Sequence, residues 1–208
     1  MKKNYQITFL GPQGSGKGTQ AELLAKKLNL PIIVMGNILR EQIKKKTVIG
    51  KKIEKIVDSG RLIPSEITNQ LMVEEIKKQK NGFIIDGYPR EIVQAKFLTK
   101  IANLTQAIEI TLSDQEAIKR IGGRRSCSCG EVYHLKYNPP KKVGLCDKCG
   151  KKLFVRDDDE LVAIKKRLKI YRHNVIPLEK LYKKQKILIK VDGRPSIQKI
   201  HQKIIKNF

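Results

Sequence analysis

The chain has 208 residues, 40% of them hydrophobic and 31% charged, and its formal net charge is +24. This length and apolar content predict one folded domain with room for inserted segments, and they exclude an intrinsically disordered protein. The apolar runs are shorter than the ~18 residues of a membrane span or the apolar segment of a signal peptide. We therefore expect a cytoplasmic protein without a membrane partner.

The positive charge comes mainly from lysine, with 34 lysines against 10 arginines. The lysines are spread along the whole chain, mostly on the polar sides of expected helices, so we expect no dedicated nucleic-acid partner. In such a chain the few arginines mark sites that need a rigid, bidentate cation. They are the first candidates for anion-binding residues.

Short apolar runs alternate with helical patterns along the chain. The first run leads into a glycine-rich loop, and a helix with apolar residues on one face starts at Lys17. Two or three short helices are expected between residues 37 and 78, with Asn37 and Ser65 as candidate N-caps. A long helix from about Asp158 and a final helix complete the chain. The expected strands are residues 5–10, 31–34, 83–85, 107–112 and 187–191.

This alternation predicts an α/β fold with a five-stranded parallel sheet flanked by helices. Ligands of such sheets bind beyond the carboxyl ends of the strands. Two polar segments follow strands at such ends: GPQGSGKGT after the first and DGYPR, starting at Asp86, after the third. Both are therefore expected at the ligand-binding edge of the sheet.

The segment GPQGSGKGT follows the phosphate-loop pattern G-x-x-x-x-G-K-[ST] except at one position. Gly11, Gly16 and Lys17 fit the pattern. Gly18, however, stands where a hydroxyl is expected to hold magnesium, and the next hydroxyl belongs to Thr19. Glycine amides wrap phosphates, the lysine neutralises charge, and the helix start adds its positive pole. The segment therefore predicts a nucleotide-phosphate site.

A phosphate loop with glycine after the lysine resembles that of nucleoside monophosphate kinases, most closely the adenylate kinases, and DGYPR is similar to their D-G-[FY]-P-R segment. The resemblance spans residues 5–196. It implies a P-loop fold and the reaction ATP + AMP ⇌ 2 ADP, with Mg²⁺ held largely through water that Asp86 orients. It also implies a core of residues 1–33, 64–122 and 160–208, a monophosphate-binding arm of residues 34–63, and a lid of residues 123–159.

The same resemblance implies three overlapping groups of site residues. Met35 and Asn37 stand where adenylate kinases usually have threonine and aspartate, so the identity of the accepted base stays open. The implied ATP-binding residues are Gly14, Ser15, Gly16, Lys17, Gly18, Thr19, Arg120, Arg124, Val132, Tyr133 and Arg194. The implied AMP-binding residues are Met35, Arg40, Arg61, Leu62, Ile63, Gly87, Tyr88, Pro89, Arg90, Gln94, Arg156 and Arg167. The implied catalytic residues are Lys17, Asp86, Arg90, Arg124, Arg156 and Arg167.

All cysteines of the chain lie in one segment, as the close pairs Cys127 and Cys129, then Cys146 and Cys149. This spacing predicts a four-thiolate zinc site, and the segment resembles the lid of zinc-type adenylate kinases, including VYH and NPPK. The first pair is C-x-C where that family has C-x-x-C, and a disulfide or free thiols remain alternatives. The zinc would be structural, because so small a segment cannot build a core.

The main hypothesis is a monomeric adenylate kinase whose partners are ATP, AMP and ADP. A kinase for UMP, CMP or another monophosphate is the first alternative, which Met35 allows and Gln94 disfavours. The second is a zinc-ribbon P-loop protein that binds nucleic acid. That alternative leaves DGYPR and the paired arginines without a role.

Overall fold

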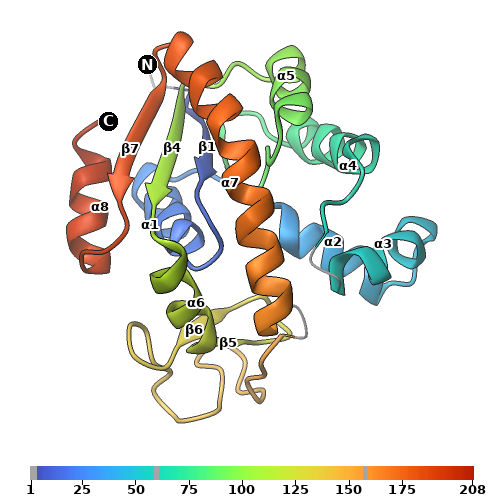
Figure 1. Ribbon diagram of the computed structural model, residues 1–208, viewed down its shortest axis with the longest axis vertical. Helices are drawn as coiled ribbons and strands as arrows, with labels where there is room; N and C mark the ends of the chain where they lie inside the picture. The colour runs from blue at the N-terminus through green and yellow to red at the C-terminus, as the bar shows by residue number, and fades with distance from the viewer. Residues whose placement is uncertain (1–3, 59–60, 157–158) are drawn as a thin grey trace.

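The computed structural model describes residues 4–58, 61–156 and 159–208 (Figure 1). Its centre is a five-stranded sheet in the order β2-β3-β1-β4-β7, in which all neighbouring strands are parallel. Each expected strand is present, with both ends within one residue of the expectation. The strands are β1 (Gln6–Leu10), β2 (Ile32–Val34), β3 (Phe83–Asp86), β4 (Gln106–Thr111) and β7 (Leu188–Asp192).

Helices cover both faces of the sheet, as the alternating strands and helices predicted. In Figure 1, α7 crosses in front of the sheet and α1 lies behind it. The helices are α1 (Lys17–Leu28), α2 (Met35–Lys44), α3 (Val48–Asp58), α4 (Ser65–Lys77), α5 (Ile92–Ile101), α6 (Asp114–Gly122), α7 (Leu161–Lys184) and α8 (Ile197–Ile205).

Each face of the sheet has its own apolar core, because side chains of a strand alternate between faces. Ile84 packs with α1 and α8 in one cluster, while its neighbours Phe83 and Ile85 pack with α4, α5 and α7 in the other. These residues are at most 3% exposed. The two cores fix β1 and β3 side by side.

Two parts stand away from the sheet. Helices α2 and α3 form a hairpin to one side, and a two-stranded antiparallel ribbon, β5 (Arg124–Ser126) and β6 (Val132–His134), lies beyond the carboxyl ends of the strands (Figure 1). The sequence pattern did not predict this ribbon, because strands of three residues are too short to show a period. None of the described helices has the length and apolar character of a membrane span.

Two expectations about helix starts are wrong. Asn37 lies inside α2, whose N-cap is Val34, and its Oδ1 accepts a hydrogen bond from Arg40 Nη2 at 2.6 Å. Ser65 is the first residue of α4, after the N-cap Pro64, and its hydroxyl donates to Glu91.

The long helix α7 begins at Leu161, and Asp159, just before its N-cap Glu160, pairs with Arg124. The interruption expected at Gly60 and the predicted helix start at Asp158 lie outside the described residues.

Candidate active site

The loop between β1 and α1 has the geometry of a phosphate cradle. Gly14 and Gly16 have φ of 81° and 89°, a left-handed conformation that glycine adopts without strain, and Gly16 is the N-cap of α1. A side chain on Gly14 would lie 2.8 Å from the carbonyl oxygen of Ala117, so the loop packs closely on α6. Ser15 is fully buried, and its hydroxyl has no hydrogen-bond partner within the described part of the chain. The loop is therefore preorganised for an anion.

Lys17 lies at the centre of a charged cluster. Burial lowers its pKa from the ordinary 10.5 to about 8, Asp86 opposes this change, and the nearby Arg90, Arg124 and Arg156 add to it. The lysine thus lies close to one carboxylate and three guanidinium groups drawn from three other segments of the chain. Positive charge is concentrated around Lys17 because the segment after β3 and the lid both lie close to the phosphate loop.

Asp86 faces the phosphate loop because β1 and β3 are parallel neighbours, with Phe9 opposite Asp86. Its Oδ1 is buried and lacks a hydrogen-bond partner among the described residues. A side chain on Gly18 would place its Cβ 3.2 Å from Oδ2 of Asp86. The glycine after Lys17 therefore lets the start of α1 lie close to this carboxylate.

The DGYPR segment is tied to the sheet and to α5. Thr8 donates a hydrogen bond to the carbonyl of Tyr88 at 2.8 Å, and the backbone N–H of Arg90 donates to Oε1 of Gln94 at 2.7 Å. Gln94 is only 2% exposed, and its amide nitrogen donates to Thr68 at 3.2 Å. The sequence did not predict that Gln94 holds the DGYPR segment in place through the backbone of Arg90. The predicted contact of Gln94 with a base stays a prediction.

The arginines in and beside the lid ribbon are held by protein groups. Arg124 forms a two-point ion pair with Asp159, in which Nε donates to Oδ2 at 2.8 Å, and Nε of Arg156 donates to the Ser126 hydroxyl at 2.7 Å. Arg120 donates to the carbonyl of Gly193 at 2.9 Å. These contacts set the orientation that each guanidinium has before a ligand arrives.

The other predicted residues are not among the charged groups around Lys17. Arg167 donates to the carbonyl of Val57 in α3 at 3.0 Å, and the exposed Arg194 pairs with Asp192 at 2.8 Å. Met35 is 2% exposed. Thr19 is half-buried in the first turn of α1, Val132 is exposed, and Tyr133 is buried in the lid. In the arm, Arg61 is exposed, Leu62 is half-buried and Ile63 is buried. Gly87 and Pro89 lie in the DGYPR segment, between Asp86 and Arg90. Their roles stay predictions.

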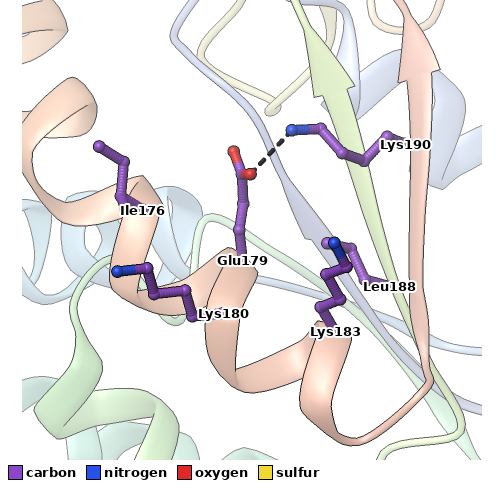
Figure 2. A pocket seen from close by; sticks show the side chains of 6 residues that line it. All are labelled: Ile176, Glu179, Lys180, Lys183, Leu188 and Lys190. Atoms are coloured by element: carbon purple, nitrogen blue, oxygen red, sulfur yellow. Dashed lines mark hydrogen bonds and ion pairs between the residues drawn. The ribbon is translucent and has the colours of Figure 1, made fainter.

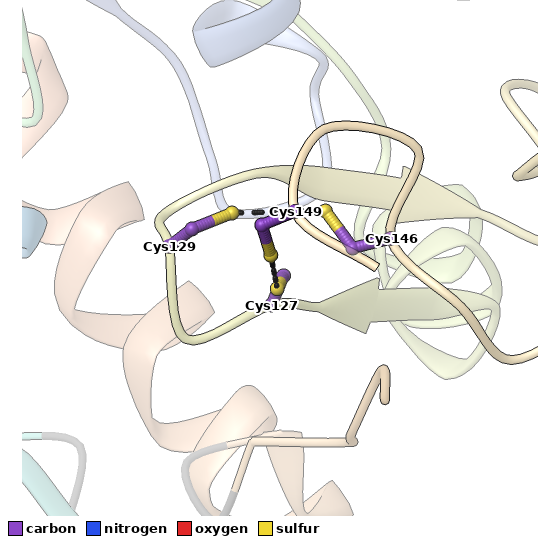
Figure 3. Close-up of side chains that lie close together, drawn as sticks. All are labelled: Cys127, Cys129, Cys146 and Cys149. Carbon is purple, nitrogen blue, oxygen red and sulfur yellow. Dashed lines mark hydrogen bonds between the residues drawn. The ribbon is translucent and has the colours of Figure 1, made fainter. Parts of the chain in front are cut away.

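The four cysteines converge in the lid (Figure 3). Their sulfur atoms all lie within 4.8 Å of one another, and the closest pairs, Cys127 with Cys149 and Cys129 with Cys146, are 3.4 and 3.6 Å apart. All four cysteines are free in the structure, since a disulfide needs a separation of about 2.05 Å. The sulfur separations approach the ~3.8 Å edge of a tetrahedron with Zn–S bonds of about 2.3 Å.

Each cysteine pair ends in a glycine with positive φ, Gly130 and Gly150, which lets the chain turn back at the cluster. In the shortened first pair the N–H of Cys127 donates to the carbonyl of Glu131 at 2.9 Å, which closes the turn with one residue fewer. The donor set therefore fits a structural zinc ion.

A groove of about 560 Å³ lies elsewhere, between α7 and β7 (Figure 2). In it Lys190 pairs with Glu179 at 2.8 Å and with the buried Glu109 at 3.3 Å. Burial, followed by the charge of Glu179, raises the pKa of Glu109. The groove runs along the second half of α7, away from the phosphate loop, and is not part of the candidate site. Its lining residues are Ile176, Glu179, Lys180, Lys183, Leu188 and Lys190.

Residues 9–187 match the sequence model of the family described as adenylate kinase. An adenylate kinase of Treponema denticola is 42% identical over 195 residues, which cover 92% of this chain and 93% of that protein. Those of Methanothrix thermoacetophila and Methanocella arvoryzae are 42% and 43% identical, and the matches cover 96% and 94% of this chain and the same shares of those proteins. With a parallel sheet, a phosphate loop and these relatives, the chain belongs to the adenylate kinase family.

Proposed function

We propose that the chain catalyses the reversible transfer of the terminal phosphoryl group of ATP to AMP, giving two ADP. The observation that carries this function is the cluster in which Lys17, Asp86 and Arg90, at the carboxyl ends of β1 and β3, meet Arg124 and Arg156 of the lid. Relatives named adenylate kinase, about 42% identical over nearly the whole chain, support the same reaction.

The residues of the cluster suit a reaction that needs no general base. The accepting group is a phosphate oxygen, which is already ionised at neutral pH, so catalysis rests on alignment and on neutralising the charge of the transferring group. Lys17 approaches the phosphates from the loop, Arg90 holds the monophosphate, and Arg124 and Arg156 approach from the lid. The lowered pKa of Lys17 reflects burial and the crowding of these cations, which the negative charge of bound nucleotides would relieve.

Two metal ions are part of the proposal. Asp86 is the residue that would orient the hydration shell of Mg²⁺, because its buried Oδ1 is unsatisfied among the described residues. The bound ion would supply further charge neutralisation on the phosphates. Cys127, Cys129, Cys146 and Cys149 would hold a Zn²⁺ that fixes the shape of the lid.

Water has to be kept from the transferring group, since otherwise ATP would be hydrolysed. We assign this task to closure of the arm, residues 34–63, and the lid, residues 123–159, over the core. The separation of the α2–α3 hairpin from the sheet and the placing of the ribbon beyond the strand ends support these two flaps (Figure 1).

A coupled assay with ATP and AMP, GMP, CMP or UMP in turn tests the function. Turnover dominated by AMP is expected; pyrimidine turnover would favour the UMP/CMP alternative. Absence of turnover combined with salt-sensitive RNA binding would favour the nucleic-acid alternative.

A pair of variants tests the arginine cluster. Arg90→Ala should lower turnover by roughly 10²- to 10³-fold, as loss of one group that stabilises the transition state does, without loss of helix content by circular dichroism. Arg172→Ala, which removes a surface arginine paired with Asp114, is the matched control and should keep its turnover. Full activity of Arg90→Ala would refute the role assigned to that residue.

A further inference from the structure

Tyr133 is packed against the cysteine cluster. It lies in β6, is 7% exposed, and shares one apolar cluster with the two buried cysteines, Cys127 and Cys146. Its hydroxyl oxygen is 3.5 Å from Sγ of Cys146 and 2.8 Å from the backbone nitrogen of Asp147, the next residue. One phenol thus contacts both the sulfur and the backbone of the second cysteine pair.

The direction of these hydrogen bonds follows from the protons that are available. The Asp147 N–H can only donate, so the Tyr133 oxygen is its acceptor. The single proton of the phenol is then left for the remaining neighbour, the sulfur of Cys146. A thiolate that binds a metal carries negative charge and is the better acceptor for such a donor.

We infer that Tyr133 is a positioning residue of the lid metal site, whose hydroxyl donates to the Cys146 thiolate and fixes the second cysteine pair against β6. The inference rests on the proposed zinc site. It assigns the phenol a place inside the lid, whereas resemblance had suggested only an approach of this residue to ATP.

The position of Tyr133 also connects the metal site with the candidate active site. In the ribbon, Tyr133 is the register partner of Arg125, and Arg124 is the partner of His134. A metal ion that holds Cys146 would therefore also hold Tyr133 in β6. Because β6 pairs with β5, the ion would in this way position the strand that carries Arg124. The chain has particular need of this support, because Cys129 and Cys149 are exposed and the first cysteine pair is one residue short of the family spacing.

Tyr133→Phe tests the inference, because it keeps the ring and removes only the hydroxyl. The affinity for Zn²⁺ is measured by competition with a chromophoric chelator, and the site is followed by the thiolate-to-metal absorption of the Co²⁺ form. We expect Tyr133→Phe to bind Zn²⁺ roughly 10- to 100-fold more weakly, as loss of a hydrogen bond to a metal ligand does. Tyr137→Phe, at an exposed tyrosine of the same lid, is the matched control and should keep the wild-type affinity.

Three results would overturn the inference. The first is equal Zn²⁺ affinity of Tyr133→Phe and wild type. The second is a loss of melting temperature in Tyr133→Phe that is as large in the metal-free proteins as in the loaded ones, which would make the hydroxyl a support of the fold alone. The third is a wild-type protein that binds neither Zn²⁺ nor Co²⁺; this result removes the metal site as well, but leaves the phosphoryl-transfer assay as a separate test.

Discussion

Replacing Lys17 by methionine is expected to make the folded chain more stable while it destroys turnover. Burial and three nearby arginines lower the pKa of Lys17 from 10.5 to about 8, so the charged form is disfavoured in the folded state. At about 1.4 kcal/mol for each unit of pKa change, the charged lysine lowers the free energy of unfolding by roughly 3 kcal/mol at neutral pH. Methionine has a similar length without the charge and should recover up to that amount.

The sign of the effect gives it a characteristic pH dependence. Because the folded-state pKa is the lower one, the unfolded chain binds more protons at Lys17 between pH 8 and 10.5, and wild-type stability rises with pH in this window. The methionine variant lacks this rise. Its advantage over wild type should therefore be complete well below pH 8 and shrink as the pH rises from about 8 toward 10.5.

Urea unfolding of wild type and Lys17→Met at neutral pH and at about pH 9.5 measures the difference. Lys26→Met, at an exposed lysine of the same helix, is the control and should show no such pH-dependent gain. Turnover of Lys17→Met should fall by about 10³-fold. A variant that is less stable than wild type at neutral pH, or a gain that is the same at both pH values, would refute the reasoning.

Two further substitutions test the charges around the lysine. Asp86→Asn keeps the shape of the side chain but removes its charge, so turnover should fall by about 10²-fold and require more Mg²⁺; an unchanged Mg²⁺ titration would contradict the assignment. Asp159→Asn leaves Arg124 without its buried carboxylate partner, so the melting temperature in calorimetry should fall by several degrees. Glu41→Gln, which breaks an exposed ion pair, is its control, and equal melting of both variants would show that the buried pair adds nothing.

The sheet was predictable because its strands are short, mainly apolar runs bounded by loops, as burial on both faces favours, with few polar residues such as Thr8 and Glu109 inside them. Helix starts were less predictable. Asn37 and Ser65 have the residue types of N-caps, but their side chains bond to Arg40 and Glu91 instead. One of these partners lies 26 residues away in sequence, beyond any local pattern.

The candidate site was predicted where chemistry follows from local sequence. The phosphate loop and DGYPR lie at neighbouring strand ends, as expected for a parallel sheet. The roles of Gln94 and Tyr133 could not be predicted, since both depend on groups brought close only by folding: the Arg90 backbone in one case and the Cys146 sulfur in the other. The spacing of glutamine or tyrosine residues along a sequence does not indicate that such a side chain forms a buried hydrogen bond.

The glycine that departs from the common phosphate-loop pattern lies beside the aspartate of DGYPR. The parallel register of β1 and β3 places Asp86 against the start of α1, with Oδ2 only 3.2 Å from where a Cβ of residue 18 would lie. A side chain at this position would make a tight contact with the carboxylate, which a shift of a few tenths of an ångström in the Asp86 side chain would relieve, so glycine gives the closest fit without being required. In the proposed function the carboxylate offers the oxygen that the missing hydroxyl would have supplied near the phosphates. Gly18 and Asp86 therefore have to be read together, because the pairing of two strands brings both residues to the proposed phosphate site.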